Sequence, residues 1–277
     1  MQFSVSYLYD KNKQIKMFDW KTTAVICIAT RHYLDYWHDL VKSFEKLNIK
    51  TNFYLFSDDL ISVEKIRTAF PKQMINVFEI QSLGWPLASL LRYELIAGIE
   101  NIVTEEFVIY LDADMLIKKD FSNVVSPNTF NNGIALVLHP GFWRPKKNST
   151  KFYFNHLELF LKDLYFCILS GGIGSWEKRK TSHSFVRRKL RNNYYCGGTW
   201  MGVNEDFFSM VRTLANAVQC DVNNNVMAIW HDESHLNKWA TQNSHSILDP
   251  GFCYAEEFKH LSGLTQYIQA VKKLEEK

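Results

Sequence analysis

The chain contains 277 residues, of which 47% are hydrophobic and 22% charged, enough to bury the core of one large domain or two small ones. Its formal net charge is only +3 and no nucleic-acid-reading motif is present, so we set nucleic acid aside as a partner. Charged side chains from Asp10 to Asp19 interrupt the first twenty residues, so we expect no signal peptide and no membrane span. Five scattered cysteines without a Cys-x-x-Cys pair favour free thiols in a reducing, cytoplasmic setting.

Strand and helix patterns alternate through the first 80 residues. Nearly continuous apolar runs over 23–29, 51–56 and 75–80 are typical of strands buried on both faces. Between them, apolar side chains recur every three or four residues over 33–47, and 63–70 has a similar helical pattern. This alternation predicts a mainly parallel sheet sandwiched by helices, an α/β architecture.

The remaining sequence is less regular. The segment 152–169 is rich in Phe, Leu and Tyr but is interrupted by charged residues, so it predicts an amphipathic helix rather than a membrane span. The basic run 187–191 is most simply a solvated face. Further predicted elements are helices over 85–99, 205–220 and 232–240 and strands over 107–111, over 133–139 and ending at Trp230.

Two aspartates come directly after the apolar strand at 107–111, at the strand end where open α/β sheets bind ligands. On an extended backbone, Asp112 and Asp114 would project to the same side and could share one divalent cation. Mg²⁺ and Mn²⁺ take few protein ligands and complete their coordination with substrate phosphates, so the pair indicates a diphosphate donor. An exposed turn without a ligand is the alternative interpretation.

A second carboxylate pair, Asp232 and Glu233, lies between His231 and His235 in the segment 230–238. Acidic residues in the first turn of a helix stabilise the helix dipole, so capping is one interpretation. The other interpretation is catalytic, because a carboxylate next to an anomeric carbon is what double-displacement sugar chemistry uses.

Three other features have ordinary structural interpretations. Gly197 and Gly198, in the glycine-rich segment 194–202, could form a turn or a β-bulge, although they also permit close approach of a ligand to the backbone. His139 precedes the Pro-Gly turn at 140–141 and would usually be a loop histidine with a structural hydrogen bond. Arg92 would ordinarily be a surface helix residue.

Together these motifs resemble glycosyltransferase family 6, which contains the histo-blood-group A and B transferases, α1,3-galactosyltransferase and soluble bacterial members. The resemblance implies a single catalytic domain with a GT-A fold, a UDP-sugar donor and dependence on Mn²⁺, with Mg²⁺ as a substitute. It further implies transfer with retention to the 3-hydroxyl of a β-galactoside, often a fucosylated one. The segments that carry it are 28–33 (Ile-Ala-Thr-Arg-His-Tyr), 83–86 (Leu-Gly-Trp-Pro), 110–114 (Tyr-Leu-Asp-Ala-Asp), 139–142 (His-Pro-Gly-Phe), 194–198 (Tyr-Tyr-Cys-Gly-Gly) and 230–238 (Trp-His-Asp-Glu-Ser-His-Leu-Asn-Lys).

The resemblance assigns donor-side roles to individual positions. Ile28 and Tyr33 would line the uridine pocket, with Tyr33 against the uracil ring. Asp112 and Asp114 would hold the metal and the diphosphate, and Arg92 would steady the donor sugar and the first aspartate.

It likewise assigns roles near the reacting carbon and the acceptor. Asp232 would bind hydroxyl groups of the donor sugar, and Glu233 would be the nucleophile or the stabiliser of the cation. Trp85, His139 and Trp230 would face the acceptor galactose.

Gly197 and Gly198 also belong to the donor side. In this family the residue at position 198 helps to separate GalNAc from galactose donors. A glycine there leaves room for the acetamido group, so the resemblance favours UDP-GalNAc over UDP-Gal.

Within the single domain 1–277, the resemblance places a nucleotide-binding half at 23–115 and an acceptor and catalytic half at 116–258. Residues 150–175 are expected to be an insertion, with a covering, membrane-contacting or decorative role left open, and 259–277 a helical tail that matches the family poorly. A UDP-sugar hydrolase and a catalytically weak glycan-binding protein on the same scaffold remain the alternatives.

Overall fold

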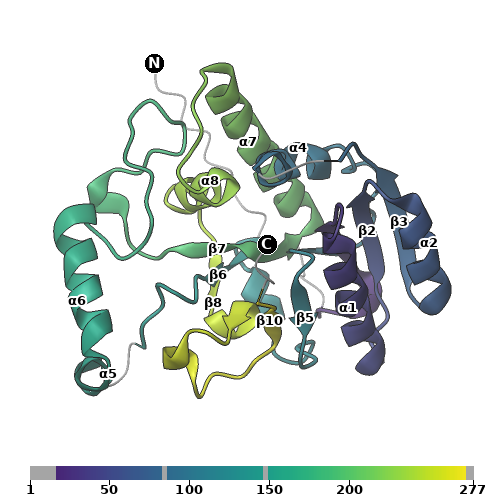
Figure 1. The fold of residues 1–277 in the computed structure, drawn as a ribbon, viewed down its shortest axis with the longest axis horizontal. Coiled ribbons are helices and arrows are strands. Elements are labelled where there is room, and N and C mark those ends of the chain that lie inside the picture. Colours follow the sequence, from purple (N-terminus) through teal and green to yellow (C-terminus); the bar gives the residue numbers. More distant parts are fainter. Residues whose placement is uncertain (1–16, 83–85, 146–148, 273–277) are drawn as a thin grey trace.

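A seven-stranded mixed sheet forms the centre of the computed structural model, which describes residues 17–82, 86–145 and 149–272. Its strand order is β3-β2-β1-β4-β7-β6-β8 (Figure 1). The pairs β1–β2, β2–β3, β1–β4 and β6–β8 are parallel, whereas β7 runs antiparallel to both β4 and β6. The strands are β1 (Thr23–Ile28), β2 (Asn52–Ser57), β3 (Met74–Glu79), β4 (Phe107–Leu111), β6 (Ile134–Leu138), β7 (Tyr195–Val203) and β8 (Ser246–Leu248).

Helices cover both faces of this sheet, because alternate side chains of its central strands enter different cores. In β1, Val25 and Cys27 pack into one core together with α1, while Ala24 and Ile26 pack into a second core with α4 and α7. The predicted α/β architecture with a mainly parallel sheet is therefore confirmed. The helices are α1 (Tyr33–Lys46), α2 (Leu60–Ala69), α3 (Leu87–Leu90), α4 (Arg92–Ala97), α5 (Ser149–Asn155), α6 (Leu157–Tyr165), α7 (Asn204–Asn223) and α8 (His231–Ala240).

A second, three-stranded sheet packs beside the first in the order β5-β10-β9. It consists of β5 (Met115–Ile117), β9 (Tyr254–Ala255) and β10 (Ile268–Ala270). The predicted helical tail over 259–277 is wrong in its described part, which contains one 3-10 turn (Lys259–Leu261) and then β10. Ile268 is fully buried and pairs antiparallel with β5, so tertiary pairing decides the structure of this segment.

Three other local predictions need correction. The glycine-rich segment is not a turn but lies in the central strand β7, whose 199–203 part pairs with β4; of the two interpretations the β-bulge fits, because the register with β6 shifts between the pairs Leu136–Trp200 and Leu138–Tyr195. The helical pattern over 85–99 is split into α3 and α4, so that Arg92 begins a separate helix with a buried side chain. Trp230 ends no strand and instead lies in the turn that precedes α8.

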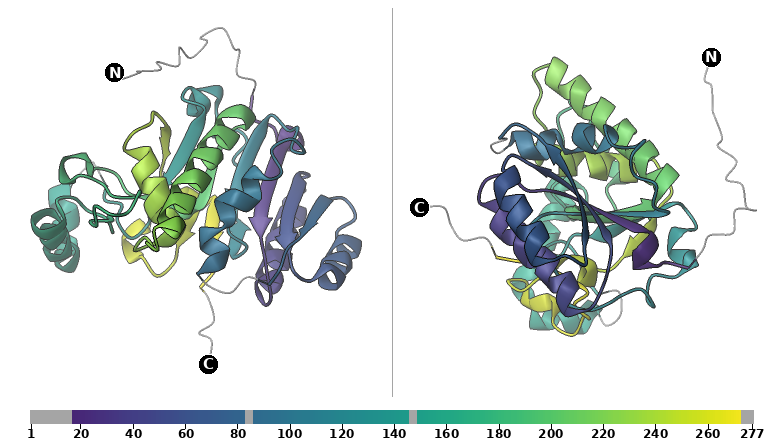
Figure 2. Two further views of the ribbon diagram at one scale, coloured as in Figure 1. Left: turned by 90° about the horizontal axis from the view of Figure 1, so that it is seen from above. Right: turned by 90° about the vertical axis from the view of Figure 1, so that its right-hand side faces the viewer.

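The segment 152–169 is helical, as predicted, but it is divided into α5, α6 and a π turn (Phe166–Ser170). These elements lie at one end of the molecule, away from the central sheet, in both Figure 1 and Figure 2. No helix in the described ranges is long and apolar enough to cross a membrane. All five cysteines in this part of the chain are free thiols.

Candidate active site

Arg92 is the centre of a cluster that joins four segments of the chain. Its guanidinium lies 2.9 Å from Asp232 Oδ2 and 3.2 Å from Asp112 Oδ1, and its Nη1 donates to the Gly197 carbonyl at 3.0 Å. The same group lies over the Tyr110 ring, 4.9 Å from the centroid. Arg92 is buried rather than on the surface, so the ordinary interpretation as a solvated helix residue is wrong.

The charge of Arg92 is retained despite its burial. Burial alone would lower the pKa of the guanidinium, but Asp232, Tyr110 and Asp112 act against this and hold it well above its usual value. A buried charge of this kind is tolerated only when it is paired and hydrogen-bonded, as it is here. The cluster is therefore a preorganised cationic centre between two carboxylates.

Asp112 occupies the end of β4, but the backbone there is not extended. The Met115 amide donates to the Asp112 carbonyl at 3.1 Å, which closes a tight turn between β4 and β5. The expected projection of Asp112 and Asp114 to one side of an extended chain is thus wrong. The Asp112 carboxylate is 30% exposed and accepts from the Tyr110 hydroxyl at 2.8 Å, whereas Asp114 is only 6% exposed.

This turn still offers hard oxygen ligands at a strand end. Divalent ions such as Mn²⁺ and Mg²⁺ need only one or two carboxylates when substrate phosphates complete the coordination. The part-exposed Asp112 carboxylate fits that requirement. Among the residues with described positions, no group of three or more His, Cys, Asp or Glu side chains forms a ready-made metal cluster.

Gly198 allows β7 to approach this turn closely. Its carbonyl accepts from the Asp112 amide at 2.9 Å, and a Cβ at Gly198 would lie 2.6 Å from Met115 Cε and 2.9 Å from Asp112 Oδ2. A side chain at position 198, which is predicted to face the donor sugar, would therefore also face the turn from Asp112 to Met115, called here the aspartate turn. A larger residue at this position would have to displace the flexible end of Met115 or the Asp112 carboxylate.

Glu233 lies in the first turn of α8 and reaches across to β7. Its Oε2 accepts from the Gly197 amide at 2.8 Å, so Gly197 contacts Arg92 with its carbonyl and Glu233 with its N–H. Because this amide belongs to β7 rather than to α8, capping of its own helix does not account for Glu233. The two polar backbone groups of Gly197 therefore link Glu233 directly, and Asp232 through Arg92, to β7.

The pKa values of both carboxyl groups are displaced towards neutrality. Burial raises the pKa of Glu233 to about 7, although hydrogen bonds from Gly197 and Tyr194 act in the opposite direction. Burial also raises the pKa of Asp232 to about 7, opposed by Arg92 and assisted by Asp112 and Glu233. Buried acids with perturbed pKa values next to a specific cation are typical of catalytic sites.

Asn237 fixes the position of α8 against β7. It accepts from the Tyr195 amide at 2.8 Å, and it donates to the Tyr195 carbonyl and the Glu233 carbonyl, both at 2.9 Å. We did not predict this role. Asn237 is four residues after Glu233, so helical spacing would have placed the two on the same face of α8.

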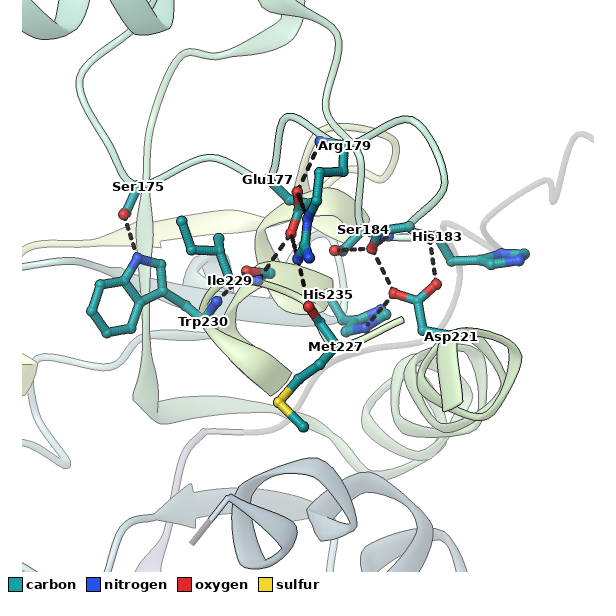
Figure 3. Close-up of polar contacts among 12 residues, drawn as sticks. Ser175, Glu177, Arg179, His183, Ser184, Asp221, Met227, Ile229, Trp230 and His235 are labelled. Carbon is teal, nitrogen blue, oxygen red and sulfur yellow. Dashed lines mark hydrogen bonds and ion pairs between the residues drawn. The ribbon is translucent and has the colours of Figure 1, made fainter. Parts of the chain in front are cut away.

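A buried polar network supports the other side of α8. Asp221 of α7 accepts from Ser182 Oγ at 2.5 Å and from the His183 amide at 2.6 Å, and it faces His235 Nε2 at 3.4 Å (Figure 3). Burial lowers the pKa of His235 to about 4 in spite of the attraction of Asp221. His235, which flanks Glu233 in sequence, thus points away from it and has a structural role.

Glu177 continues this network towards the start of α8. It is buried, accepts from the Arg179 side chain at 2.6 Å and 3.0 Å, and accepts from the Ile229 amide at 2.9 Å (Figure 3). Trp230 comes next in the chain, is about half exposed and donates through Nε1 to Ser175 Oγ. Segment 175–186 therefore holds the turn from which α8 begins.

Of the predicted acceptor residues, Trp230 lies in this turn, and His139 is linked to it through Tyr194, whose hydroxyl donates to the Ser175 carbonyl at 3.2 Å. His139, at the end of β6, accepts from the Gly141 amide through Nδ1 at 3.0 Å, and its ring centroid is 5.8 Å from that of Tyr194. Burial lowers the pKa of His139 to about 4, so its ring is neutral at pH 7. Tyr194 connects His139 to Glu233, since it also hydrogen-bonds that carboxylate. Trp85 lies outside the described residues.

The predicted uridine residues are placed at the neighbouring strand. Ile28 ends β1 and Tyr33 begins α1, at the same edge of the sheet as Asp112 because β1 and β4 are parallel. A nucleotide held at this edge would thus lie beside the aspartate turn.

The basic run 187–191 is only partly a solvated face. Arg191 is buried and donates to the Val186 carbonyl, whereas Arg187 and Lys189 are exposed. The prediction of a wholly solvated run is therefore wrong at Arg191.

The sheet topology is consistent with a GT-A-like α/β fold, and the Arg92 cluster lies at the strand ends of its sheet. The family model for glycosyltransferase family 6 matches residues 160–276, which include both 160–175, expected to be part of an insertion, and most of the C-terminal tail. The chain is thus similar to glycosyltransferase family 6 over its C-terminal part.

Curated relatives extend the similarity towards the N-terminus. The chain is 22% identical to the histo-blood group ABO system transferase 1 of Rattus norvegicus, over 89% of this chain and 64% of the relative. It is 22% identical to the globoside alpha-1,3-N-acetylgalactosaminyltransferase 1 of Homo sapiens, over 80% and 57%. For the O-antigen biosynthesis glycosyltransferase WbnI of Escherichia coli the identity is 23%, over 74% and 75%. The chain thus spans less than two thirds of the two animal relatives.

Proposed function

We propose that this protein is a retaining transferase that moves GalNAc, or galactose, from a UDP-sugar in α1,3 linkage to a β-galactoside acceptor, including fucosylated ones. The observation that carries the proposal is the backbone of Gly197, whose C=O binds Arg92 and whose N–H binds Glu233. The names of the relatives, which include an alpha-1,3-N-acetylgalactosaminyltransferase, support the linkage and the sugar.

In this proposal Glu233 acts at the anomeric carbon. The bond from C1 to the diphosphate oxygen breaks with its electron pair on UDP, and Glu233 captures or stabilises C1. The acceptor 3-hydroxyl then attacks C1 on the face that UDP left and releases its proton to the departing diphosphate. Where Glu233 has captured C1, that bond breaks in the same step and its electron pair returns to the carboxylate. The Gly197 and Tyr194 hydrogen bonds favour the ionised form of Glu233 that this role needs. Asp232, held by Arg92, binds hydroxyl groups of the donor sugar.

Asp112, with Asp114, is the proposed position of Mn²⁺ or Mg²⁺. An ion bound there would neutralise charge on the leaving diphosphate. Ile28 and Tyr33 are proposed to hold the uridine, and Trp85, His139 and Trp230 the acceptor galactose. Transfer that persists in EDTA would contradict the metal assignment.

For the donor sugar we infer a preference for UDP-GalNAc over UDP-Gal. Gly198 presents no side chain towards the donor, and its nearest neighbour is the methyl end of Met115, a flexible side chain that can yield to an acetamido group. Comparable turnover of both donors by purified protein would refute this preference.

The decisive assay is a donor screen that monitors UDP release with and without Mn²⁺, using lactose and 2′-fucosyllactose as acceptors. Release that requires both the metal and the acceptor supports the transferase. Release without acceptor would identify a UDP-sugar hydrolase, and acceptor binding without release would identify a glycan-binding protein.

A Glu233→Gln variant tests the catalytic carboxylate. Because the amide keeps the size but not the charge, transfer should fall about 100-fold or more while UDP affinity is retained. Glu256→Gln, at an exposed position, is the matched control and should leave both unchanged. Near-normal turnover by Glu233→Gln would remove this residue from the mechanism.

A further inference from the structure

The helical arm at one end of the molecule, defined as residues 149–191, presents most of the apolar side chains of its helices to solvent. It contains α5, α6, the π turn and the basic run, and its helices project away from the central sheet (Figures 1 and 2). Eight large apolar side chains along it are between 43% and 88% exposed: Phe154, Leu157, Phe160, Leu161, Leu164, Tyr165, Ile168 and Leu169. Contiguous exposed apolar surface of this kind marks a site of association.

The orientation of α6 is fixed by a buried ion pair. Asp163 is 4% exposed and accepts from Arg144 Nε at 2.6 Å and Nη2 at 2.7 Å, and from the Tyr153 hydroxyl at 2.9 Å. The helix therefore turns an acidic side chain to the protein and its leucines to the outside, the reverse of a helix that packs on a core. This bidentate pair keeps the apolar face exposed.

The arm also concentrates positive charge. Residues 149–191 contain nine Lys and Arg and three Asp and Glu, a net charge of +6, whereas the whole chain carries +3, so the remainder carries −3. Arg188 of the basic run donates to the carbonyls of Cys167 and Ile168, which places that run against the end of the π turn. The exposed Arg187 and Lys189 lie next to it in the chain.

We propose that this arm binds the surface of an anionic lipid bilayer, with its apolar face at the level of the headgroups and its basic side chains on the lipid phosphates. Short helices that combine an apolar face with Lys and Arg bind membranes in this manner without crossing them. A second copy of the chain is disfavoured as the occupant, because two arms of +6 would repel each other.

Membrane binding through the arm would also orient the candidate active site. A cavity of about 640 Å³ lies between the arm and the start of α8, with Tyr165 and Phe166 on one side and Ile229 and His231 on the other. Docking would therefore hold the start of α8, and with it Glu233, close to the headgroup layer.

Vesicle flotation of the full chain, without any sugar substrate, tests the proposal. The protein should float with vesicles of phosphatidylcholine and phosphatidylglycerol, and much less with phosphatidylcholine alone or in high salt. Leu161→Glu should reduce binding about tenfold or more, and Lys189→Gln about fivefold. Ile61→Glu is the matched control, because Ile61 is 74% exposed on α2, at the opposite end of the molecule in Figure 1, and should bind as wild type.

Failure of the wild-type protein to float, or equal flotation of Leu161→Glu, would overturn the proposal. Sedimentation velocity tests whether a second copy of the chain covers the arm instead. If the wild-type protein is a dimer that does not bind vesicles, and Leu161→Glu dissociates this dimer, the arm serves self-association. UDP release with a soluble acceptor should be the same for Leu161→Glu and wild type. Loss of flotation therefore stays separable from loss of transfer.

Discussion

Replacing Asn237 with Ala should loosen the junction between α8 and β7 that positions Glu233. Asn237 is 1% exposed and makes three hydrogen bonds, two with the backbone of Tyr195 and one with the Glu233 carbonyl. Alanine removes all three and leaves the Tyr195 N–H and C=O buried without these partners. The substitution therefore disturbs the placement of Glu233 while its side chain stays intact.

The size of the effect is set by the groups left without partners. Each buried backbone group that loses its partner costs about 1–3 kcal/mol, so the two groups of Tyr195 together cost about 3 kcal/mol when partial relaxation is allowed. For a chain of this length, about 3 kcal/mol lowers Tm by roughly 6–12 °C. The catalytic effect comes in addition, because a shift of α8 changes the distance between Glu233 and the Gly197 amide.

Urea denaturation and transfer kinetics at a temperature where the variant is folded measure the two effects separately. Asn243→Ala is the control, since Asn243 makes one exposed side-chain hydrogen bond to the Trp239 carbonyl near the end of the same helix. It should change stability by less than about 0.5 kcal/mol. If Asn237→Ala were as stable as this control, or turned over like wild type, the inference that Asn237 positions α8 would be refuted.

Three further changes test other parts of the site. Arg92→Lys should lower kcat/KM about 10- to 100-fold, because one ammonium cannot replace a guanidinium that contacts Asp112 and Asp232 together; a near-wild-type value would contradict this. Gly198→Ala should weaken Mn²⁺ binding in titration calorimetry, because its Cβ would approach the Asp112 carboxylate, and unchanged affinity would count against that geometry. The pKa of His235 is lowered to about 4 in the folded protein, so between pH 6.5 and 4 the unfolded chain binds more protons than the folded one. The free energy of unfolding should therefore fall by up to about 3 kcal/mol as the pH drops through this range. His235→Gln should flatten that part of the pH profile in urea denaturation, and identical profiles would refute a neutral buried histidine.

The sequence was sufficient to predict those strands and helices whose apolar residues follow a regular pattern and are buried. The runs that form β1, β2 and β4 are buried almost throughout, and such runs indicate central strands without further information. The strand β4 also located Asp112 correctly at the sheet edge. The periodicity of a strand carries no information about the backbone beyond its last residue, so the sequence could not decide between an extended segment and the turn that Asp112 to Met115 form.

The local helical pattern alone assigned Arg92 to the surface, because the partners that bury this side chain are distant in sequence. Its hydrogen bond to Gly197 spans 105 residues, and a single arginine in a helical pattern gives no sign of such a contact. The same holds for Asp221, whose partner Ser182 is 39 residues away in an irregular segment. Local patterns assign a charged helix residue to solvent by default, and only a tertiary partner reverses that assignment.

In the arm, local patterns mislead in the opposite way, because apolar residues of a helix face solvent and a charged residue is buried. The apolar residues of α6 predict a face that packs on the protein, yet the ion pair between Asp163 and Arg144 turns that face outwards. Breaking a buried, bidentate pair would leave an uncompensated charge, so one polar contact rather than the apolar pattern sets the orientation of the helix. The apolar face then needs another partner, and the charge of the arm indicates anionic lipid.

Gly197 explains why the two carboxylate motifs found in the sequence act as one site. A Cβ at this position would lie 3.2 Å from Asp232 Oδ2 and 3.3 Å from Glu233 Cβ, closer than side chains normally approach. The glycine therefore permits α8 to approach β7, and the hydrogen bonds of Asn237 hold the helix there. As a result the Gly197 C=O can bind Arg92 and the Gly197 N–H can bind Glu233. Since Arg92 also contacts Asp112, a displacement of α8 is transmitted through the guanidinium to the aspartate turn.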